Sequence, residues 1–273
     1  MNKQIYSIIS LLLLALTMIG CSVGTKPTEG NTNSNSNSNA KTSSNSENKS
    51  SENKSETNKE NKNTSSSNSS SSSTNSDLAG TYTVNGKGMD GKTYQGEVVL
   101  TNRDEVYQMS WTIGSESYDG VAVQSGNTLA VAYTTGENGK GCGAVIYKIN
   151  ADNSLTGKWG EWGVNSSGTE KATAIGELSG SIGAFDVSGT NPNGSAYKGK
   201  LAISRGENDT YQFAWDVGTK YVGTGVKMGD YLAAGSGAKQ CGFVIYEIKG
   251  NTLEGKWGVP GSSELGTEKA VKK

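Results

Sequence analysis

The chain has 273 residues, a formal net charge of −1, no histidine and only three prolines against 38 glycines. The absence of histidine excludes Ser-His and Cys-His nucleophile pairs and histidine metal ligands, and it removes the usual general base near neutral pH. The balanced charge does not fit the concentrated basic face of a nucleic-acid-binding protein. We therefore predict no catalytic residue, no metal site, no cofactor and no enzymatic activity.

Residues 1–20 have the pattern of an export signal. Lys3 supplies a positive start, an apolar stretch runs from Tyr6 to Ile19, and the segment ends at Gly20-Cys21. So short an apolar stretch is typical of a signal peptide, not of a membrane-spanning helix. The ending resembles the lipobox of bacterial lipoproteins, although Met18 replaces the usual Leu, Val or Ile. The resemblance implies that Cys21 is acylated and anchors the mature chain to a membrane. The alternative is an unmodified Cys21 in a secreted or uncleaved protein.

Residues 21–77 form a polar tract between this anchor and the rest of the chain. The tract consists almost entirely of Ser, Asn, Thr, Lys and Glu. Such a composition cannot bury enough apolar surface to offset the entropy lost on ordering. We therefore expect a disordered tether that holds the following domains away from the membrane surface.

The remaining chain is one sequence repeated twice, over residues 78–176 and 177–273. The matching segments occur in the same order in both copies, which identifies a duplication. The matching pairs are Tyr107–Trp111 with Tyr211–Trp215, Cys142–Tyr147 with Cys241–Tyr246, Leu155–Gly160 with Leu253–Gly258, and Gly168–Ala172 with Gly266–Ala270. The repeat predicts two tandem homologous domains.

Apolar and polar residues alternate within each copy. Met109, Trp111 and Ile113 alternate with Ser110 and Thr112, and this period of two is typical of a half-buried strand. Short glycine-containing turns separate such runs. We therefore predict an all-β protein with about seven or eight antiparallel strands per copy, joined as a meander. Because open sheet edges invite aggregation, each copy should close into a small β-barrel, or alternatively form a sandwich.

Five tryptophans divide into two groups. Trp111, Trp159, Trp215 and Trp257 occupy matching positions in the two copies, and we interpret them as core residues and not as ligand-stacking rings. Trp162 has no such counterpart, since proline occupies the matching position, and it lies in a glycine-rich loop. It is therefore our candidate contact residue for a partner. The alternative is that its ring covers a neighbouring strand.

Two further residue pairs also repeat. We interpret Glu170 and Glu268 as solvated or ladder-capping carboxylates. Cys142 and Cys241 lie one in each copy and cannot form a four-cysteine zinc site. If its strand is unbroken, each cysteine points away from the core row that contains Tyr147. We expect free, partly buried thiols. Because exported proteins form disulfides, a bridge between the domains is the alternative.

The second copy also carries a family resemblance. It contains Gly189–Ser195 (Gly-Thr-Asn-Pro-Asn-Gly-Ser), then Tyr197 and Gly199, a Tyr-x-x-x-Trp strand, and a closing Gly-Thr-Glu. This pattern looks like a family of small exported bacterial proteins often labelled fibronectin-binding, and it covers nearly all of each copy. The first copy departs from it at residues 86–92. The resemblance implies binding to a host matrix protein, but it supplies no binding-site residues.

We therefore expect a lipid-anchored protein of the cell envelope, facing outside the cytoplasm. The leading hypothesis is adhesion: two modules on one tether bind a macromolecular partner such as fibronectin, with increased avidity. The alternatives are a carrier that holds a small apolar ligand inside calycin-like barrels, and an envelope structural or inhibitor module. A barrel filled with Trp and Tyr side chains would exclude the carrier.

Overall fold

The computed structural model describes residues 77–135, 139–237 and 241–273. The predicted signal peptide, Cys21 and the tether lie outside these ranges, so the expectations for them stay predictions. The described residues form strands and turns without a helix, and none of them forms a helix that could cross a membrane. The expected all-β class is confirmed.

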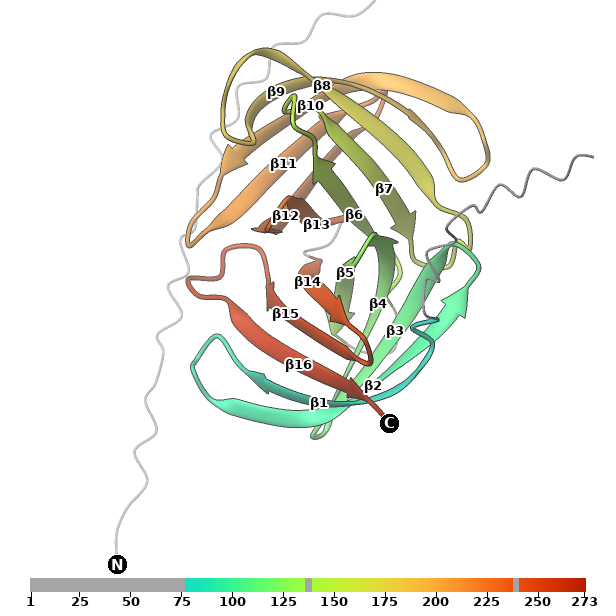
Figure 1. Ribbon diagram of the computed structural model, residues 1–273, viewed down its shortest axis with the longest axis vertical. Helices are drawn as coiled ribbons and strands as arrows, with labels where there is room; N and C mark the ends of the chain where they lie inside the picture. The colour runs from blue at the N-terminus through green and yellow to red at the C-terminus, as the bar shows by residue number, and fades with distance from the viewer. Residues whose placement is uncertain (1–76, 136–138, 238–240) are drawn as a thin grey trace, which may run out of the picture. The chain divides into compact units, whose positions relative to one another are not determined.

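Two closed antiparallel barrels account for all the strands of the described residues (Figure 1). The first barrel consists of β1 (Gly80–Lys87), β2 (Thr93–Arg103), β3 (Val106–Ile113), β4 (Glu116–Ser125), β5 (Thr128–Thr135), β14 (Gly242–Lys249), β15 (Thr252–Gly258) and β16 (Gly266–Lys272). The second consists of β6 (Cys142–Ile149), β7 (Leu155–Glu161), β8 (Gly168–Ser179), β9 (Ile182–Thr190), β10 (Ala196–Arg205), β11 (Thr210–Asp216), β12 (Lys220–Met228) and β13 (Tyr231–Gly237). The barrel is therefore the correct alternative, and the sandwich is not.

The barrels do not coincide with the sequence repeats. The first barrel takes β1–β5 from the first repeat and β14–β16 from the second, whereas the second barrel takes β6–β8 from the first repeat and β9–β13 from the second. The boundaries at 78–176 and 177–273 therefore mark the duplication but do not delimit the barrels, which corrects our expectation that each copy closes on itself. The two repeats exchange their last three strands within one chain.

Equivalent strand pairings close the two barrels. In the first, β5 pairs with β14, with Val131 opposite Val244, and in the second β13 pairs with β6, with Ala234 opposite Val145. Because β6 and β14 have matching sequences, either could complete either barrel with the same hydrophobic pattern. The period-two pattern therefore predicts the strands but not which copy supplies them.

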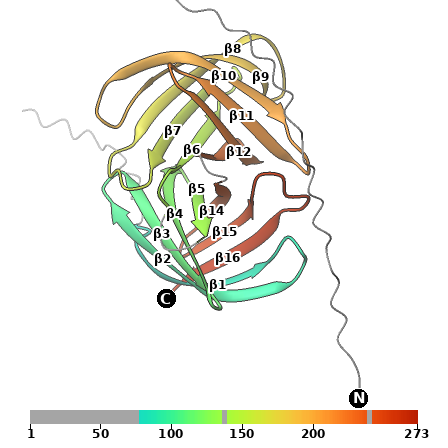
Figure 2. The same cartoon turned by 180° about the vertical axis from the view of Figure 1, so that it is seen from behind.

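The exchanged strands are buried on both faces. In β5, Leu129 and Val131 belong to the core of the first barrel, while Ala130 and Ala132 belong to a separate apolar cluster between the barrels. This inter-barrel cluster collects the outward-facing side chains of β4, β5 and β14 from one barrel and of β6, β12 and β13 from the other. Figure 2 shows β4, β5, β6, β12 and β14 together in the middle of the described region. Burial of both faces is what makes these strands nearly continuously apolar.

A disulfide joins Cys142 and Cys241, with their Cα atoms 5.9 Å apart. The expectation of free thiols is therefore wrong, and the alternative of a bridge between the domains is right. Cys142 begins β6 and Cys241 directly precedes β14, so the bridge joins the starts of the two exchanged segments. Both cysteines belong to the inter-barrel cluster, on the strand face opposite Tyr147. Strand exchange brings the two cysteines close enough to form a bridge, although they are far apart in the sequence.

A single repeat should form a dimer. The fragment Asp77–Gly176 contains β1–β7 and the first nine residues of β8, from Gly168 to Gly176, and two copies can exchange these last three strands as the two repeats do here. We expect size-exclusion chromatography with light scattering to give twice the fragment mass. The Cys142 thiols of the two copies should form an intermolecular disulfide, visible on a non-reducing gel. Cys142→Ser should remove the covalent bond but keep the dimer. A cooperatively folded monomer would contradict the exchange.

Reduction of the disulfide should destabilise the whole chain. The bridge closes a loop with a sequence separation of 99 residues, and native disulfides of this kind contribute about 2–4 kcal/mol to the free energy of unfolding. Urea unfolding with and without a thiol reductant measures this contribution. The double variant Cys142→Ser, Cys241→Ser is the control, and its unfolding should not respond to reductant. Identical wild-type curves with and without reductant would show that the bridge contributes nothing.

Candidate ligand-binding cavities

Each barrel holds a buried glutamate, which corrects our interpretation of both glutamates. Glu170 on β8 is 5% exposed and Glu268 on β16 is 8% exposed. In β8, Gly168, Glu170 and Ala172 are buried, while the intervening residues are exposed. The same alternation is visible in the sequence, where the glutamate is two residues from an alanine on the same face of the strand. That alternation places the carboxylate on the inward face of the strand, although a charged side chain is ordinarily expected to face water.

In the second barrel, tyrosines and tryptophans form a hydrogen-bonded chain around Glu170. The hydroxyl groups of Tyr147 and Tyr197 both donate to the carboxylate, the latter over 2.9 Å. The Trp215 indole donates to the Tyr147 hydroxyl over 2.8 Å, and the Trp159 indole donates to the Tyr197 hydroxyl over 3.1 Å. The carboxylate is thus the final acceptor of two converging donor chains.

The first barrel contains the equivalent cluster with one difference. Tyr246 and Tyr94 donate to Glu268, and the Tyr94 bond is 2.8 Å long. Here the Trp111 indole donates directly to the carboxylate, over 3.1 Å. The Trp257 indole nitrogen is buried and has no hydrogen-bond partner within the described residues. Glu268 therefore accepts from two tyrosines and directly from a tryptophan, whereas Glu170 accepts from two tyrosines and has the Trp215 indole as a further donor that lowers its pKa.

Burial dominates the electrostatics of both clusters. Desolvation raises the pKa of Glu170 and of Glu268 above the ordinary glutamate value, and the hydrogen bonds from the tyrosines offset part of that rise. Burial and the adjacent carboxylate also raise the pKa of Tyr147 and Tyr246 well above the usual range, so both phenols stay protonated and act as donors. Among the described residues, no group of three or more Cys, Asp or Glu side chains is placed to hold a metal ion.

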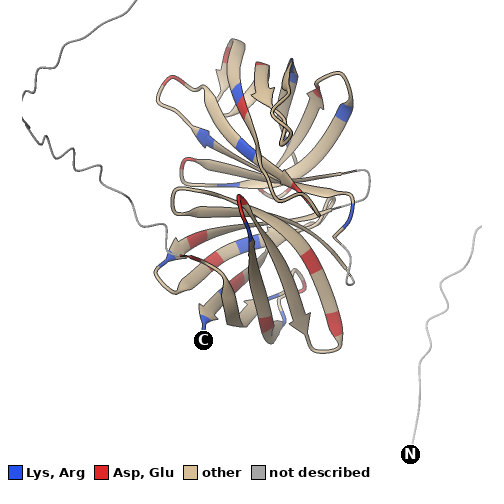
Figure 3. Cartoon of the chain, turned by 90° about the vertical axis from the view of Figure 1, so that its right-hand side faces the viewer, with Lys and Arg blue, Asp and Glu red and all other residues tan. Residues whose placement is uncertain are grey.

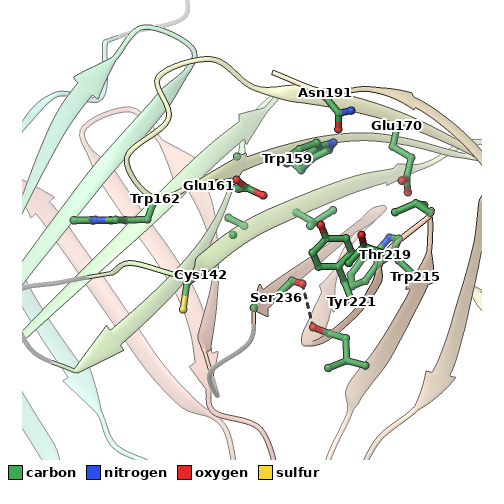
Figure 4. A pocket seen from close by; sticks show the side chains of 18 of the residues that line it. Cys142, Trp159, Glu161, Trp162, Glu170, Asn191, Trp215, Thr219, Tyr221 and Ser236 are labelled. Atoms are coloured by element: carbon green, nitrogen blue, oxygen red, sulfur yellow. Dashed lines mark hydrogen bonds between the residues drawn. The ribbon is translucent and has the colours of Figure 1, made fainter. Parts of the chain in front are cut away.

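Both clusters line cavities, and the cavities differ in size. The cavity of the second barrel has a volume of about 810 Å³, and that of the first barrel about 210 Å³. The larger cavity is lined by Glu170, Trp159, Trp215, Tyr197 and Tyr221, together with polar groups such as Asn191 and Thr219 (Figure 4). Exposed side chains at its edge include Tyr221 and Val222, so the cavity opens to solvent.

One pair of equivalent positions contributes to the difference in volume. Tyr133 on β5 pairs with Gly120 and Gly242, and Ser236 on β13 pairs with Gly223 and Gly143. The Tyr133 ring occupies space inside the first barrel, where its centroid is 6.1 Å from Trp111 and 6.0 Å from Tyr118. Ser236 has no ring, and its hydroxyl donates to the Val222 carbonyl over 3.0 Å. The second barrel is therefore the more open one.

The structure brings the four paired tryptophans to the cavities. Trp111 and Trp215 are buried in the barrel cores, and Trp159 and Trp257 are partly buried. All four also line a cavity, so the core interpretation is incomplete. Each cavity combines both repeats, since Trp159 and Glu170 come from the first repeat and Trp215 from the second.

Trp162 lies in the turn after β7, at the junction of the barrels. Its backbone N–H donates to the Cys142 carbonyl over 3.0 Å, and its partly buried ring packs against the inter-barrel cluster and near Gly139. Figure 4 shows the ring pointing away from Trp159 and Trp215. The residue lines the edge of the larger cavity and also covers neighbouring strands. Its role as a partner contact stays a prediction.

In comparisons with known protein families, curated proteins and solved structures, nothing matches this chain. The resemblance to fibronectin-binding proteins therefore stays a prediction from the sequence. The class that the geometry defines is a pair of eight-stranded antiparallel barrels that exchange strands, each with a carboxylate buried among aromatic donors.

Stability should depend on pH through Glu268. Its pKa is raised in the folded state, so its contribution to stability is fully present below the ordinary glutamate pKa and is lost as pH rises through the raised value. As pH rises, the wild-type protein should therefore lose stability relative to Glu268→Gln. The loss in unfolding free energy should be at most about 1.4 kcal/mol per pH unit. Urea unfolding between about pH 4 and pH 8 measures this difference.

Other titrating groups are shared by both proteins and cancel in that difference. Glu264→Gln changes an exposed carboxylate in the same segment, and it is the matched control that should follow the wild-type curve. Parallel curves for wild type and Glu268→Gln would contradict the raised pKa.

Proposed function

We propose that this protein is a binding protein of the cell envelope that captures a small molecule inside its second barrel. The observation that carries the proposal is the 810 Å³ cavity lined by aromatic rings around one buried carboxylate. Small-molecule sites typically have volumes of about 300–1,000 Å³ and combine apolar walls with a few placed polar groups. The smaller cavity falls below that range, so the second barrel is the proposed site.

The filling of the barrels supports a carrier over the adhesion hypothesis. We expected a barrel filled with Trp and Tyr side chains to exclude a carrier. Tyr133 partly fills the first barrel in this way, but Ser236 leaves the second barrel open. Binding of a macromolecule such as fibronectin is supported by the sequence resemblance alone. The surface charges favour neither reading, because basic and acidic residues are interspersed over the strands of both barrels (Figure 3).

The Cys142–Cys241 disulfide supports the proposed compartment. Disulfides persist in oxidising environments outside the cytoplasm and are rare inside it. Export directed by residues 1–20 and lipid anchoring at Cys21 are also part of the proposal, and a disulfide outside the cytoplasm agrees with both. The tether would then hold the cavity in the space outside the membrane. We also propose that binding involves no chemical step, since aromatic donors already engage the Glu170 carboxylate.

Ser236→Tyr should close the cavity and abolish binding. The neutral fluorescent probe N-phenyl-1-naphthylamine reports entry into an apolar site by its emission. We expect the wild-type protein to bind it and Ser236→Tyr to weaken binding by at least about tenfold, because the new ring occupies the cavity. The fold should tolerate the new tyrosine, because a glycine lies beside this position in both barrels. In the first barrel, a Cβ at Gly242 would lie 2.3 Å from the Tyr133 ring, so the ring fits there because residue 242 is a glycine. Gly143 is the equivalent glycine, and it pairs with Ser236.

Two further variants control this experiment. Ser204→Tyr places the same residue on the exposed face of β10 in the same barrel, and it should bind like wild type. Tyr133→Ser should enlarge the cavity of the first barrel and increase the amount of bound probe. If Ser236→Tyr melts like wild type and binds the probe equally well, the ligand does not occupy this cavity.

A further inference from the structure

We infer that the ligand of the second-barrel cavity carries a cationic ammonium group, which binds between the aromatic rings and the Glu170 carboxylate. This inference rests on the proposed function, and it names the chemical class of the ligand. Three features of the cavity carry it: the Glu170 carboxylate that lines it, the aromatic rings around that carboxylate, and the charges along the wall.

The Glu170 carboxylate lines the cavity of the second barrel. It accepts hydrogen bonds from the hydroxyl groups of Tyr147 and Tyr197, and the Trp215 indole is a third donor that lowers its pKa. An ionised carboxylate offers about four lone-pair sites. A cationic group in the cavity can therefore approach this carboxylate without displacing its tyrosine donors.

Aromatic rings surround the approach to this carboxylate. Trp159, Trp215 and Tyr221 line the same cavity, and Figure 4 shows the Glu170 carboxylate pointing toward Trp215. The Trp215 ring is held in place by Phe213, which stacks on it with centroids 5.5 Å apart and an interplanar angle of 12°. The faces of aromatic rings attract cations, most strongly when water is excluded. Such walls favour an ammonium group over a neutral hydroxyl or amide donor.

The charges that line the cavity are also suited to a cation. The charged side chains on its wall are Glu170, Glu161 and Lys220. The Lys220 ammonium is exposed and lies 4.0 Å from the Asp216 carboxylate, so a neighbour outside the cavity balances its charge. Burial raises the pKa of the Glu170 carboxyl, and hydrogen bonds from tyrosine and tryptophan groups offset part of that rise. A cation at close range stabilises the ionised form of a buried carboxylate further than such dipolar groups alone.

Choline and 3,3-dimethylbutan-1-ol test the inference directly. The two molecules have the same shape and the same hydroxyl group, and they differ only in that a quaternary nitrogen replaces a carbon. Each is titrated against the wild-type protein by calorimetry and by displacement of N-phenyl-1-naphthylamine. We expect choline to bind at least about tenfold more tightly than the neutral alcohol. This comparison uses the wild-type chain and does not depend on whether a variant folds.

Variants then locate the selectivity. Glu170→Gln should remove most of the preference for choline over the neutral alcohol. Glu268→Gln makes the same change in the first barrel and should keep the preference. Ser236→Tyr retains Glu170 but fills the cavity, and it should bind neither molecule. Thermal melting of each variant verifies that it is folded.

The outcomes separate this inference from the proposed function. If choline binds no better than the neutral alcohol while the fluorescent probe still binds the second barrel, the cationic ligand is wrong and the proposed function stands. If neither the probe nor either small molecule binds, both are wrong. A folded Glu170→Gln variant that keeps the full preference for choline would remove Glu170 from the site and overturn the inference.

Discussion

The strands β5, β6, β13 and β14 are apolar on both faces, and such a strand is stable only when both faces are covered. One face of each belongs to a barrel interior and the other to the cluster between the barrels. Pairing β5 with β14 and β13 with β6 meets both requirements in one chain. The cavities follow from this arrangement, because Glu170 and Trp215 meet in the second barrel although they come from different repeats. Neither repeat contains a complete site.

Duplication made two similar barrels, and a few substitutions then made them unequal. Both keep the carboxylate, its two tyrosine donors and a pair of tryptophans, because this hydrogen-bonded cluster allows a charge to be buried at all. The residue equivalent to Ser236 is Tyr133, and its ring occupies space that stays open in the second barrel. The first barrel is therefore the more completely filled one, and the second retains a larger cavity.

The sequence predicts the strands well because alternation at Met109 and Trp111 reflects one wet face and one buried face. It does not predict the exchange, since β6 and β14 have matching patterns and satisfy either pairing equally. The disulfide was missed for the same reason, because its two cysteines approach only in the exchanged arrangement. Glu170 was misread because a charged residue was assumed to face water, although its alternation with Ala172 indicates the buried face. The open cavity depends on the size of single side chains, which periodicity does not report.

The exchange also sets the order in which the barrels can form during synthesis. All strands of the second barrel lie between Cys142 and Gly237, so that barrel can close while later residues are still being made. The first barrel cannot, because β1 pairs with β16 and the Lys273 backbone N–H donates to Thr81. Its five N-terminal strands must therefore wait, with open edges, for the last strands to emerge. A ribosome that stops early, or a protease that trims the C-terminus, would open the first barrel and leave the second barrel intact.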